Sequence, residues 1–315
     1  MPCFDARLAR AKDRIPLVRT RSYRVAVTTC RSSLLFEGAL VTVRDVRCTA
    51  HVASAGAEEH ASGHHLVFTR RGVFVKHTGR AARVEEVAEP VRVLLFNRGE
   101  PYRVSHPAAG GDACTVLAFD GATAADVAEQ LGERRTSPAA PFGFGSAPLT
   151  PAEVYGCQRL RAAVADSPLA IEEEGLRLLA AVVAAGRCAR GLHPPPHSAG
   201  MRRAHARLAD EVRLALATAP GRAHTLASLA RQVGRSPWQL ARIFRQETGT
   251  SIHQYLLRLR IGLALERLAQ GETHLSTLAL DLGFANHGHF TTAFRRLVGA
   301  PPAMARRHLA RPARI

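Results

Sequence analysis

The sequence predicts an α+β chain of several domains: a small antiparallel β-barrel or sandwich, then two paired helices, then an all-helical module. Short alternating apolar segments fill roughly the first 120 residues, and helical punctuation takes over near residue 150. In the last hundred residues a short helix, a glycine turn and a second helix occur twice. The length of 315 residues is ample for two or three domains.

The predicted strands lie between Tyr23 and Asp120 and are rich in β-branched and aromatic residues. They are the segments YRVAVTT, ALVTVRDVRCT, HLVFTR, GVFVKH, VRVLLFN and ACTVLAF. Successive side chains of a strand point to opposite faces, so Phe68, Phe74 or Phe96 is expected to line an interior. Which face is the inner one stays open at this level.

Two helices are predicted after residue 140. Thr150 to Glu153 has the form of a capping box with Pro151 at the first helical position, and a second helix restarts at Ser167 and Pro168. The tight turn between them predicts a helical hairpin. The proline-rich segment GLHPPPHSAG follows as a linker. The predicted domains are therefore a β domain at 1–140, the hairpin at 141–190, the linker at 191–200 and the helical module at 201–315.

Charge is concentrated in the helical module. The chain has a formal net charge of +17 and only two lysines, Lys12 and Lys76. Residues 201–315 contain 18 arginines against 6 acidic residues, whereas the first 200 residues contain 25 basic and 20 acidic residues. A frequent use of arginine throughout the chain is the alternative explanation. The asymmetry itself favours a polyanionic partner for the last domain.

The internal repeat carries the clearest local signals. Its copies are TLASLARQVGRSPWQLARIFRQETG and LSTLALDLGFANHGHFTTAFRRLVG, offset by fifty residues. In each copy a capping residue, Ser236 or Asn286, precedes a helix that ends at Gly249 or Gly299. This arrangement is a helix-turn-helix, whose second helix fits the major groove of DNA. The intervening segment, Ser251 to Gly271, predicts one helix of about 18 residues and roughly 27 Å, approaching the roughly 34 Å between successive major grooves.

The outward faces of the two second helices carry groups that bind DNA. With Leu240 and Phe244 buried, Trp238 and Arg242 point away from the domain. Arginine bonds guanine edges bidentately and glutamine bonds adenine edges. For Trp238 a packing role is the alternative. For the other basic residues of these faces, contact with phosphate or solvent competes with base readout.

Cysteine and histidine spacing indicates neither a disulfide framework nor a metal site. The six cysteines contain no C-x-x-C pair, and His60, His64, His65 and His106 lack the H-x-H and following carboxylate of a cupin site. No cofactor is predicted. The first twenty residues contain no signal-peptide core and no apolar run is long enough to span a bilayer, so a reduced, cytoplasmic protein is expected.

The last eighty or so residues resemble the DNA-binding domain of the AraC/XylS family of bacterial transcription regulators. The first family signature is matched by Leu229, Ala230, Gly234, Ser236, Leu240, Arg242 and Phe244. The second is matched by Leu278, Ala279, Gly283, Phe284, Phe290, Phe294, Arg295, Gly299, Pro302 and Arg306. The chain departs from the pattern at Gly288, His289, Thr292 and Ala305.

The resemblance implies a sequence-specific regulator that places two recognition helices in adjacent major grooves. It also implies a cupin-like β-barrel that binds a small-molecule effector, a hairpin that forms a homodimer, and contact with RNA polymerase if the protein is an activator. The DNA-binding residues expected on this basis are Ser236, Trp238, Gln239, Arg242, Arg245, His287, His289, Thr291, Thr292, Arg295 and Arg296.

One enzymatic alternative is a repair methyltransferase of the adaptive response to DNA alkylation, because such proteins can carry the same DNA-binding domain. That activity needs paired cysteines in a zinc site, and Cys3, Cys30 and Cys48 lack the paired spacing. The sequence therefore predicts a regulator without catalytic residues.

Overall fold

The front half of the chain forms two antiparallel sheets in the computed structural model, which describes residues 20–25, 28–49, 54–79, 84–133, 137–163, 167–191 and 199–309. The larger sheet has the order β1-β2-β3-β10-β5-β8-β11 and the smaller one β4-β9-β6-β7. The bounds are β1 Thr20–Val25, β2 Thr28–Glu37, β3 Val41–Cys48, β4 Glu59–His60, β5 His64–Arg71, β6 Phe74–Thr78, β7 Val84–Ala88, β8 Arg92–Phe96, β9 Pro101–Ser105, β10 Asp112–Phe119 and β11 Ser146–Pro148.

The central strands β5, β8 and β10 of the larger sheet are buried on both faces, and the strand alternation assigns their side chains to one of two cores. Val67 and Leu94 belong to a core shared with the smaller sheet, whereas Leu66 and Leu95 face the helices. Phe74 and Phe96 lie in the core between the sheets, as expected of interior residues. Phe68 does not, because its place in β5 turns it toward the helices.

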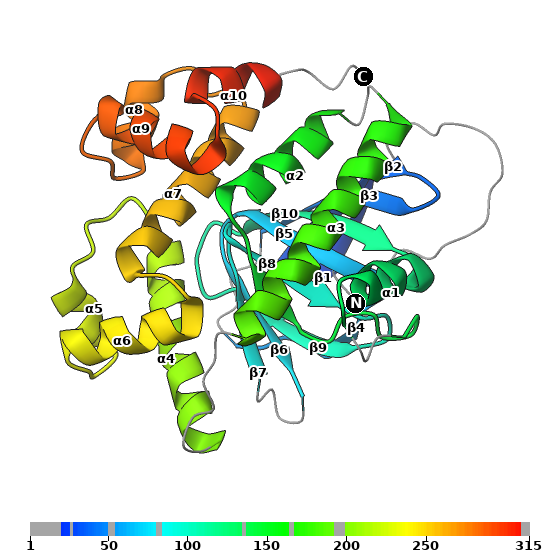
Figure 1. The fold of residues 1–315 in the computed structure, drawn as a ribbon, viewed down its shortest axis with the longest axis horizontal. Coiled ribbons are helices and arrows are strands. Elements are labelled where there is room, and N and C mark those ends of the chain that lie inside the picture. The colour runs from blue at the N-terminus through cyan, green and yellow to red at the C-terminus, as the bar shows by residue number, and fades with distance from the viewer. Residues whose placement is uncertain are drawn as a thin grey trace.

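Three helices cover the outer face of the larger sheet, α1 (Gly121–Gln130), α2 (Pro151–Ala163) and α3 (Pro168–Gly191), and α3 crosses in front of the sheet in Figure 1. Thr150 and Glu153 make the expected cap, with the Thr150 amide donating to the Glu153 carboxylate at 2.6 Å. The short helix α1 was not predicted. Asp120 caps it by accepting from the amides of Ala122 and Thr123.

The pairing of β2 with β3 produces a disulfide that cysteine spacing does not predict. Cys30 and Cys48 are direct partners across the antiparallel pair and are joined by a disulfide. They are separated by 18 residues, and a β-bulge between Leu34 and Phe36 helps set their register. The expectation of a fully reduced chain is therefore wrong for this pair. Cys114, Cys157 and Cys188 are free.

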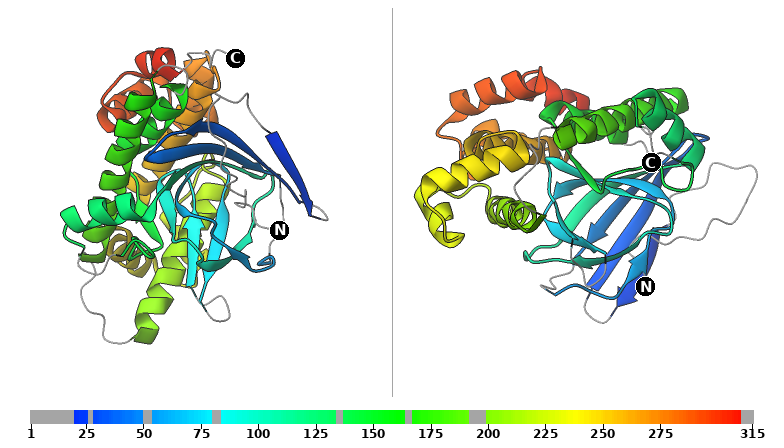
Figure 2. Two further views of the ribbon diagram at one scale, coloured as in Figure 1. Left: turned by 90° about the vertical axis from the view of Figure 1, so that its right-hand side faces the viewer. Right: turned by 60° about the horizontal axis from the view of Figure 1, so that its bottom comes forward.

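The described residues from 199 to 309 form seven helices, which lie beside the β domain (Figures 1 and 2). They are α4 Ala199–Thr218, α5 Leu226–Gln232, α6 Pro237–Thr248, α7 Ile252–Ala269, α8 Leu275–Asp281, α9 His287–Val298 and α10 Pro302–Leu309. Most of the expected linker, residues 192–198, lies outside the described residues. No helix of the described part of the chain is long and apolar enough to span a membrane.

Candidate nucleic-acid interface

Helix α6 has its start and end fixed by its own sequence. Ser236 accepts from the amide of Gln239, and the Gln239 side chain accepts from the Ser236 amide, so the capping box is reciprocal. Pro237 occupies the first turn, and Gly249 ends the helix in the left-handed region at φ 71°. The helix therefore cannot shift in register relative to its turn.

The inner and outer faces of α6 are sharply different. Leu240, Ile243 and Phe244 are buried, and Phe244 packs edge-on against Tyr255 of α7. On the outer face Trp238 is 70% exposed, and the Arg242 guanidinium lies 5.3 Å from the centre of its ring. Cation–π stacking of this kind limits the rotamers of both side chains before any ligand arrives. The structure thus brings the two expected base-reading groups of this helix together.

Helix α9 repeats this design with a different outer face. Asn286 accepts from the His289 amide at 2.8 Å, and Phe290 and Phe294 are fully buried. Gly299 ends the helix at φ 85°. The outer face is built from small, imidazole and basic groups, and its exposed members are His287, Gly288, His289, Thr292, Arg295 and Arg296.

Two of the expected residues of α9 have packing contacts as well. The His289 ring stands edge-on to Phe284 at 5.5 Å, which fixes its direction at the start of the helix. Thr291 is only half exposed, and its hydroxyl lies 3.4 Å from Nε2 of His287. His289 is thus exposed but held by a ring contact and Thr291 is half-buried, whereas Arg295 and Arg296 are exposed.

The arginines of both outer faces have no carboxylate partner in the described part of the chain. Arg242, Arg245, Arg295 and Arg296 are all exposed. Within the described part of the chain none of the four forms an ion pair, although many other arginines do. A guanidinium held near a carboxylate would have to break that pair to reach a phosphate. These four groups can bind an anion directly.

Helix α7 separates the outer face of α6 from the outer face of α9. It contains 18 residues, as the sequence predicts, and a reciprocal capping box of Ser251 and Gln254 fixes its first turn. Figure 1 shows α5 and α6 beside one end of α7 and α8 and α9 beside the other. At 1.5 Å per residue this helix measures roughly 27 Å. Helices α6 and α9, the second helices of the two helix-turn-helix units, are therefore carried on one rigid element.

Arginines of α7 lock both helix pairs to it, and sequence reasoning missed this role. Arg260 donates to the carbonyl of Pro220, before α5, at 2.9 Å and to that of Gly283, in the second turn, at 2.7 Å. Desolvation lowers the pKa of Arg260 from its ordinary value. No local pattern marks such a residue, because its partners are backbone groups 40 and 23 positions away.

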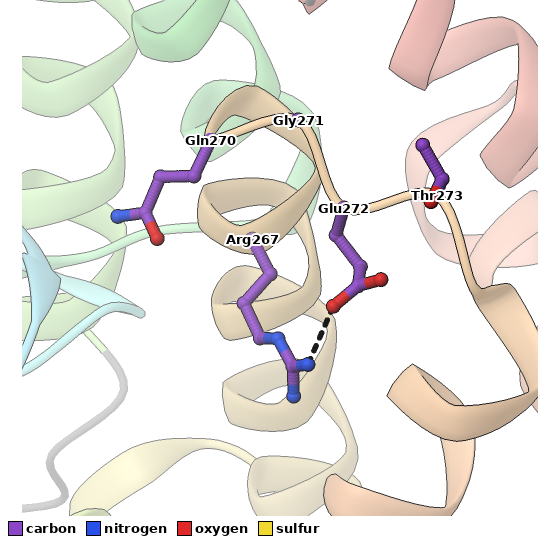
Figure 3. A pocket seen from close by; sticks show the side chains of 5 residues that line it. All are labelled: Arg267, Gln270, Gly271, Glu272 and Thr273. Atoms are coloured by element: carbon purple, nitrogen blue, oxygen red, sulfur yellow. Dashed lines mark hydrogen bonds and ion pairs between the residues drawn. The ribbon is translucent and has the colours of Figure 1, made fainter.

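The end of α7 is tied to α8 around a shallow surface hollow (Figure 3). Arg267 donates to Glu272 at 2.6 Å and to Asp281 at 2.7 Å, so one guanidinium joins the helix, its following loop and α8. Gln270 points away from this group in Figure 3 and bonds Glu266 at 2.7 Å. The hollow is thus occupied by a structural ion-pair network and lies apart from α6 and α9.

A buried polar cluster joins α7 to the β domain. The Arg70 guanidinium contacts Asp45 of β3 and donates to Glu266 of α7 at 2.7 Å. Gln158 of α2 donates to the second carboxylate oxygen of Glu266 at 2.7 Å. Arg161 of α2 lies 3.5 Å from Asp45 and 3.9 Å from Glu266, and the exposed Arg47 donates to Asp45 at 3.0 Å. The cluster thus joins the larger sheet, helix α2 and helix α7.

A second contact is made by the turn between β7 and β8. Val91 is buried among residues of α4, α5, α6 and α7, and Pro90 leaves no free space beside Gly262, where an added Cβ would stand 3.2 Å from it. Glu89 is fully buried and neither of its carboxylate oxygens has a hydrogen-bond partner in the described residues. Desolvation raises the pKa of Glu89 to about 8, against the attraction of Arg213 and Arg92.

Comparison with known proteins agrees with this geometry. Residues 229–308 match a family model described as a helix-turn-helix domain. Over 93 residues the chain is 34% identical to a putative AraC-like transcription regulator of Streptomyces lividans. Over 99 residues it is 34% identical to the HTH-type transcriptional activator RhaR of Klebsiella pneumoniae. The C-terminal part of the chain is an AraC/XylS-family helix-turn-helix domain.

The sequence matches span only part of this chain and of each relative. They cover 30% and 31% of this chain and 31% and 35% of those two relatives. Among solved structures, an AraC-type regulator from Chromobacterium violaceum is 27% identical with a TM-score of 0.33, covering 36% of this chain and 99% of its own. A ToxT variant from Vibrio cholerae is 11% identical with a TM-score of 0.37, covering 87% and 99%.

Relatives of the AraC/XylS domain include transcription regulators and one bifunctional protein. The latter is the transcriptional activator and DNA repair enzyme AdaA of Bacillus subtilis, 32% identical over 82 residues that cover 26% of this chain and 39% of AdaA. The helix-turn-helix architecture expected from the repeat is confirmed by the family match. The individual DNA-contacting residues remain predictions.

Proposed function

We propose that this protein is a sequence-specific transcription regulator that lays α6 and α9 in successive major grooves of one DNA face. The observation that carries the proposal is the pair of capped helices, each with a basic outer face, at opposite ends of an 18-residue helix. Successive major grooves on one face lie roughly 34 Å apart, and the strut of roughly 27 Å plus the radii of the flanking helices matches that repeat.

In this proposal the two reading helices contribute unequally. Trp238 and Arg242 of α6 form a preset stacked pair suited to base edges and methyl groups. Helix α9 presents Thr292, Arg295 and Arg296, of which the guanidinium groups suit phosphate contact. Discrimination between sequences is then concentrated in the half-site under α6, and α9 contributes mainly affinity.

We further propose that the β domain controls the helical domain. Its two sheets would act as a cupin-like barrel that takes a small-molecule effector, and the Arg70–Glu266 cluster would transmit the state of the sheet to α7. Effector binding would shift the population between docked and undocked arrangements. Contact with RNA polymerase is expected if the regulator is an activator, and the site of action is the cytoplasm.

Dimerisation through the hairpin is proposed to use the outward face of α3. The inward residues of α3 are not available, because Leu178, Leu179, Val182 and Val183 are buried in the core of the same chain. The outward face contains Leu169, which is 65% exposed, with Glu173, Ala180 and Ala184 one, three and four turns further along. A second copy on this face would place two helical domains on one operator.

The test is selection of genomic DNA fragments bound by the full-length chain. The expected result is one enriched motif with two blocks separated by about 10 base pairs, the repeat of the duplex. Binding should also weaken steeply with salt, since each arginine–phosphate contact releases counterions. Enrichment without any shared motif, or with equal recovery by an Arg242→Ala/Arg295→Ala double variant, would refute the proposal.

The repair methyltransferase remains the second candidate because of the similarity to AdaA. It requires a reactive thiolate that reaches alkylated DNA. In the described residues Cys30 and Cys48 are bonded to each other and Cys114 and Cys157 are buried, while Cys188 alone is exposed. Burial raises the pKa of Cys157 to about 11. A stable mass increase on a cysteine after incubation with methylated DNA would support this candidate over the regulator.

A further inference from the structure

A row of potential ligands crosses three adjacent strands in the core between the two sheets. Cys48 at the end of β3 is the direct partner of Cys30 on β2 and of Asp112 on β10. Directly paired residues of antiparallel strands share a face, so the three side chains point the same way. Cys30 and Cys48 belong to the core between the sheets, and that face is the inner one.

A fourth group reaches this row from the opposite sheet. His106 directly follows β9 and its ring lies beside Phe74, with centres 6.2 Å apart. Its Nε2 stands 3.1 Å from Oδ2 of Asp112. The Cys48 sulfur, one His106 nitrogen and one Asp112 oxygen all lie within 4.8 Å of one another, and all three residues are buried.

The backbone around the row is tightly packed, so the groups cannot drift apart. Gly111 has a φ of 67°, and an added Cβ there would stand 2.0 Å from the carbonyl oxygen of Cys48. At Gly72 it would stand 2.2 Å from the carbonyl oxygen of Gly111. Gly111 therefore allows the start of β10 to lie directly against the end of β3, and Gly72 allows the turn after β5 to lie directly against Gly111. Such preorganisation is what a binding site needs from its scaffold.

Asp112 is the group that the protein alone leaves incompletely satisfied. Its exposed fraction is 3%, and Oδ1 takes a weak contact from the Cys114 thiol at 3.5 Å. Oδ2 accepts no aligned hydrogen bond from the described residues, although Nε2 of His106 is close. Leaving a buried carboxylate oxygen without a donor costs free energy, and a cation between it and the imidazole would remove that cost.

We propose that the reduced protein binds one thiophilic divalent cation of the zinc type through Cys30, Cys48, His106 and Asp112. Two sulfur atoms, one imidazole nitrogen and one carboxylate oxygen form a tetrahedral set that such ions favour. Ligand atoms at about 2.0–2.1 Å from a tetrahedral ion lie about 3.3 Å apart, close to the present separation of His106 and Asp112.

The disulfide makes the site dependent on reduction. A dithiol reductant transfers two electrons and two protons to the Cys30–Cys48 bond, giving two thiols and the oxidised cyclic disulfide of the reductant. The cation then binds the two sulfurs as thiolates, and two protons leave to solvent. Oxidation returns the sulfurs to each other and removes half of the ligands.

The loop that joins His106 to Asp112 also faces the helical domain. Ala108 packs on Val73, Val75 and Val87, the cluster that receives Leu214 and Ala217 of α4. If the proposed function holds, this site places an effector ion beside the DNA-binding half. Metal binding itself can be measured without DNA, so failure of one proposal is distinguishable from failure of the other.

The test uses the full-length chain, reduced with dithiothreitol and freed of it under argon, and titrated with Co²⁺ as a spectroscopic probe. The expected result is one equivalent per chain, with thiolate-to-cobalt absorption in the near ultraviolet and tetrahedral bands in the visible. Zn²⁺ should displace the Co²⁺. Cys48→Ser should lose the thiolate band, whereas Cys188→Ser, which removes the exposed thiol, should leave it unchanged.

A second variant guards against misfolding of Cys48→Ser. His106→Gln keeps every cysteine, so formation of the disulfide on air oxidation, followed by mass spectrometry after alkylation, reports that the sheets are intact. Its Co²⁺ affinity should fall at least about 10-fold, the lower range for disturbing a metal site. The proposal is overturned if the reduced parent shows no thiolate band, if the oxidised parent binds equally tightly, or if folded His106→Gln binds like the parent.

Discussion

Arginine has two separate roles in this protein, and burial distinguishes them. Arg70 is buried and Arg260 is half-buried. Their guanidinium groups donate hydrogen bonds to carboxylates and carbonyls of other elements, and these bonds hold the elements together. Arg242 and Arg295 are exposed and have no ion pair among the described residues. The amino-acid composition alone gives only the positive net charge of the chain. The residue-level division shows which of those charges are free to meet a polyanion.

Replacing Arg242 with alanine tests base reading by α6. The variant should lose about 1–3 kcal/mol at the cognate site and discriminate less at the contacted base pair, because a bidentate base contact is removed. Competition binding measured by fluorescence anisotropy, against operators mutated one base pair at a time, gives both quantities. Arg98→Ala, an exposed arginine of the β domain, is the matched control and should bind like the parent. Equal loss on every operator would make Arg242 a phosphate contact.

Replacing Glu89 with glutamine tests the unpaired carboxyl between the β domain and α4. The pKa of Glu89 is raised from 4.5 to about 8 in the folded chain, chiefly by desolvation. The folded state therefore holds the proton more tightly than the unfolded state, and the associated stability is fully present below pH 4.5 and is lost as pH rises through 8.

The glutamine variant keeps a neutral side chain at every pH. The free energy of unfolding of the variant, relative to that of the parent, should therefore increase between pH 4.5 and 8, by at most about 1.4 kcal/mol per pH unit. Urea unfolding of both chains across this range measures the difference. A difference that stays constant with pH would show that Glu89 is ionised in the folded protein.

At the scale of elements, the sequence predicted what local chemistry determines and missed what pairing determines. Helices α6 and α9 begin and end at the expected residues because their caps and glycines are local signals. Strands β7 (VEEVA) and β9 (PYRVS) were missed. The first contains two glutamates and the second begins with proline, so each segment becomes a strand only by pairing with β6. Helix α1 was missed because GATAADVAEQ has weak apolar periodicity.

The hairpin gives an element-scale prediction about assembly. Ala180→Glu on the outward face of α3 should convert a dimer to monomers, because a buried unpaired carboxylate at a helix–helix contact is costly. Sedimentation equilibrium measures the change. Leu179→Asp, by contrast, should destabilise the monomer itself, since Leu179 is fully buried in its own core. An Ala180→Glu chain that sediments like the parent would move the dimer contact elsewhere.

At the scale of the whole molecule, the contact between the two halves was not foreseeable. Glu266 lies in a helix whose apolar positions were read correctly, yet its partner Arg70 is 196 residues away. A count of charges along the sequence treats Glu266 and Arg70 alike as solvent-exposed residues. Pairing of buried charges appears only when α7 lies against β5 and α2, because each charge is tolerable there only beside the others. The fold of each half was thus predictable in outline, and their docking was not.

Replacing Glu266 with glutamine tests whether this cluster holds the halves together. The variant leaves the buried Arg70 and the half-buried Arg161 with Asp45 as their remaining carboxylate in the cluster, which should cost about 3–5 kcal/mol. The parent should unfold in one calorimetric transition, and Glu266→Gln should show two, because weakened docking uncouples the sheets from the helices. Glu272→Gln, near the end of the same helix but bonded only within the helical domain, should keep one transition. A single unshifted transition for Glu266→Gln would locate the coupling in the β7–β8 turn instead.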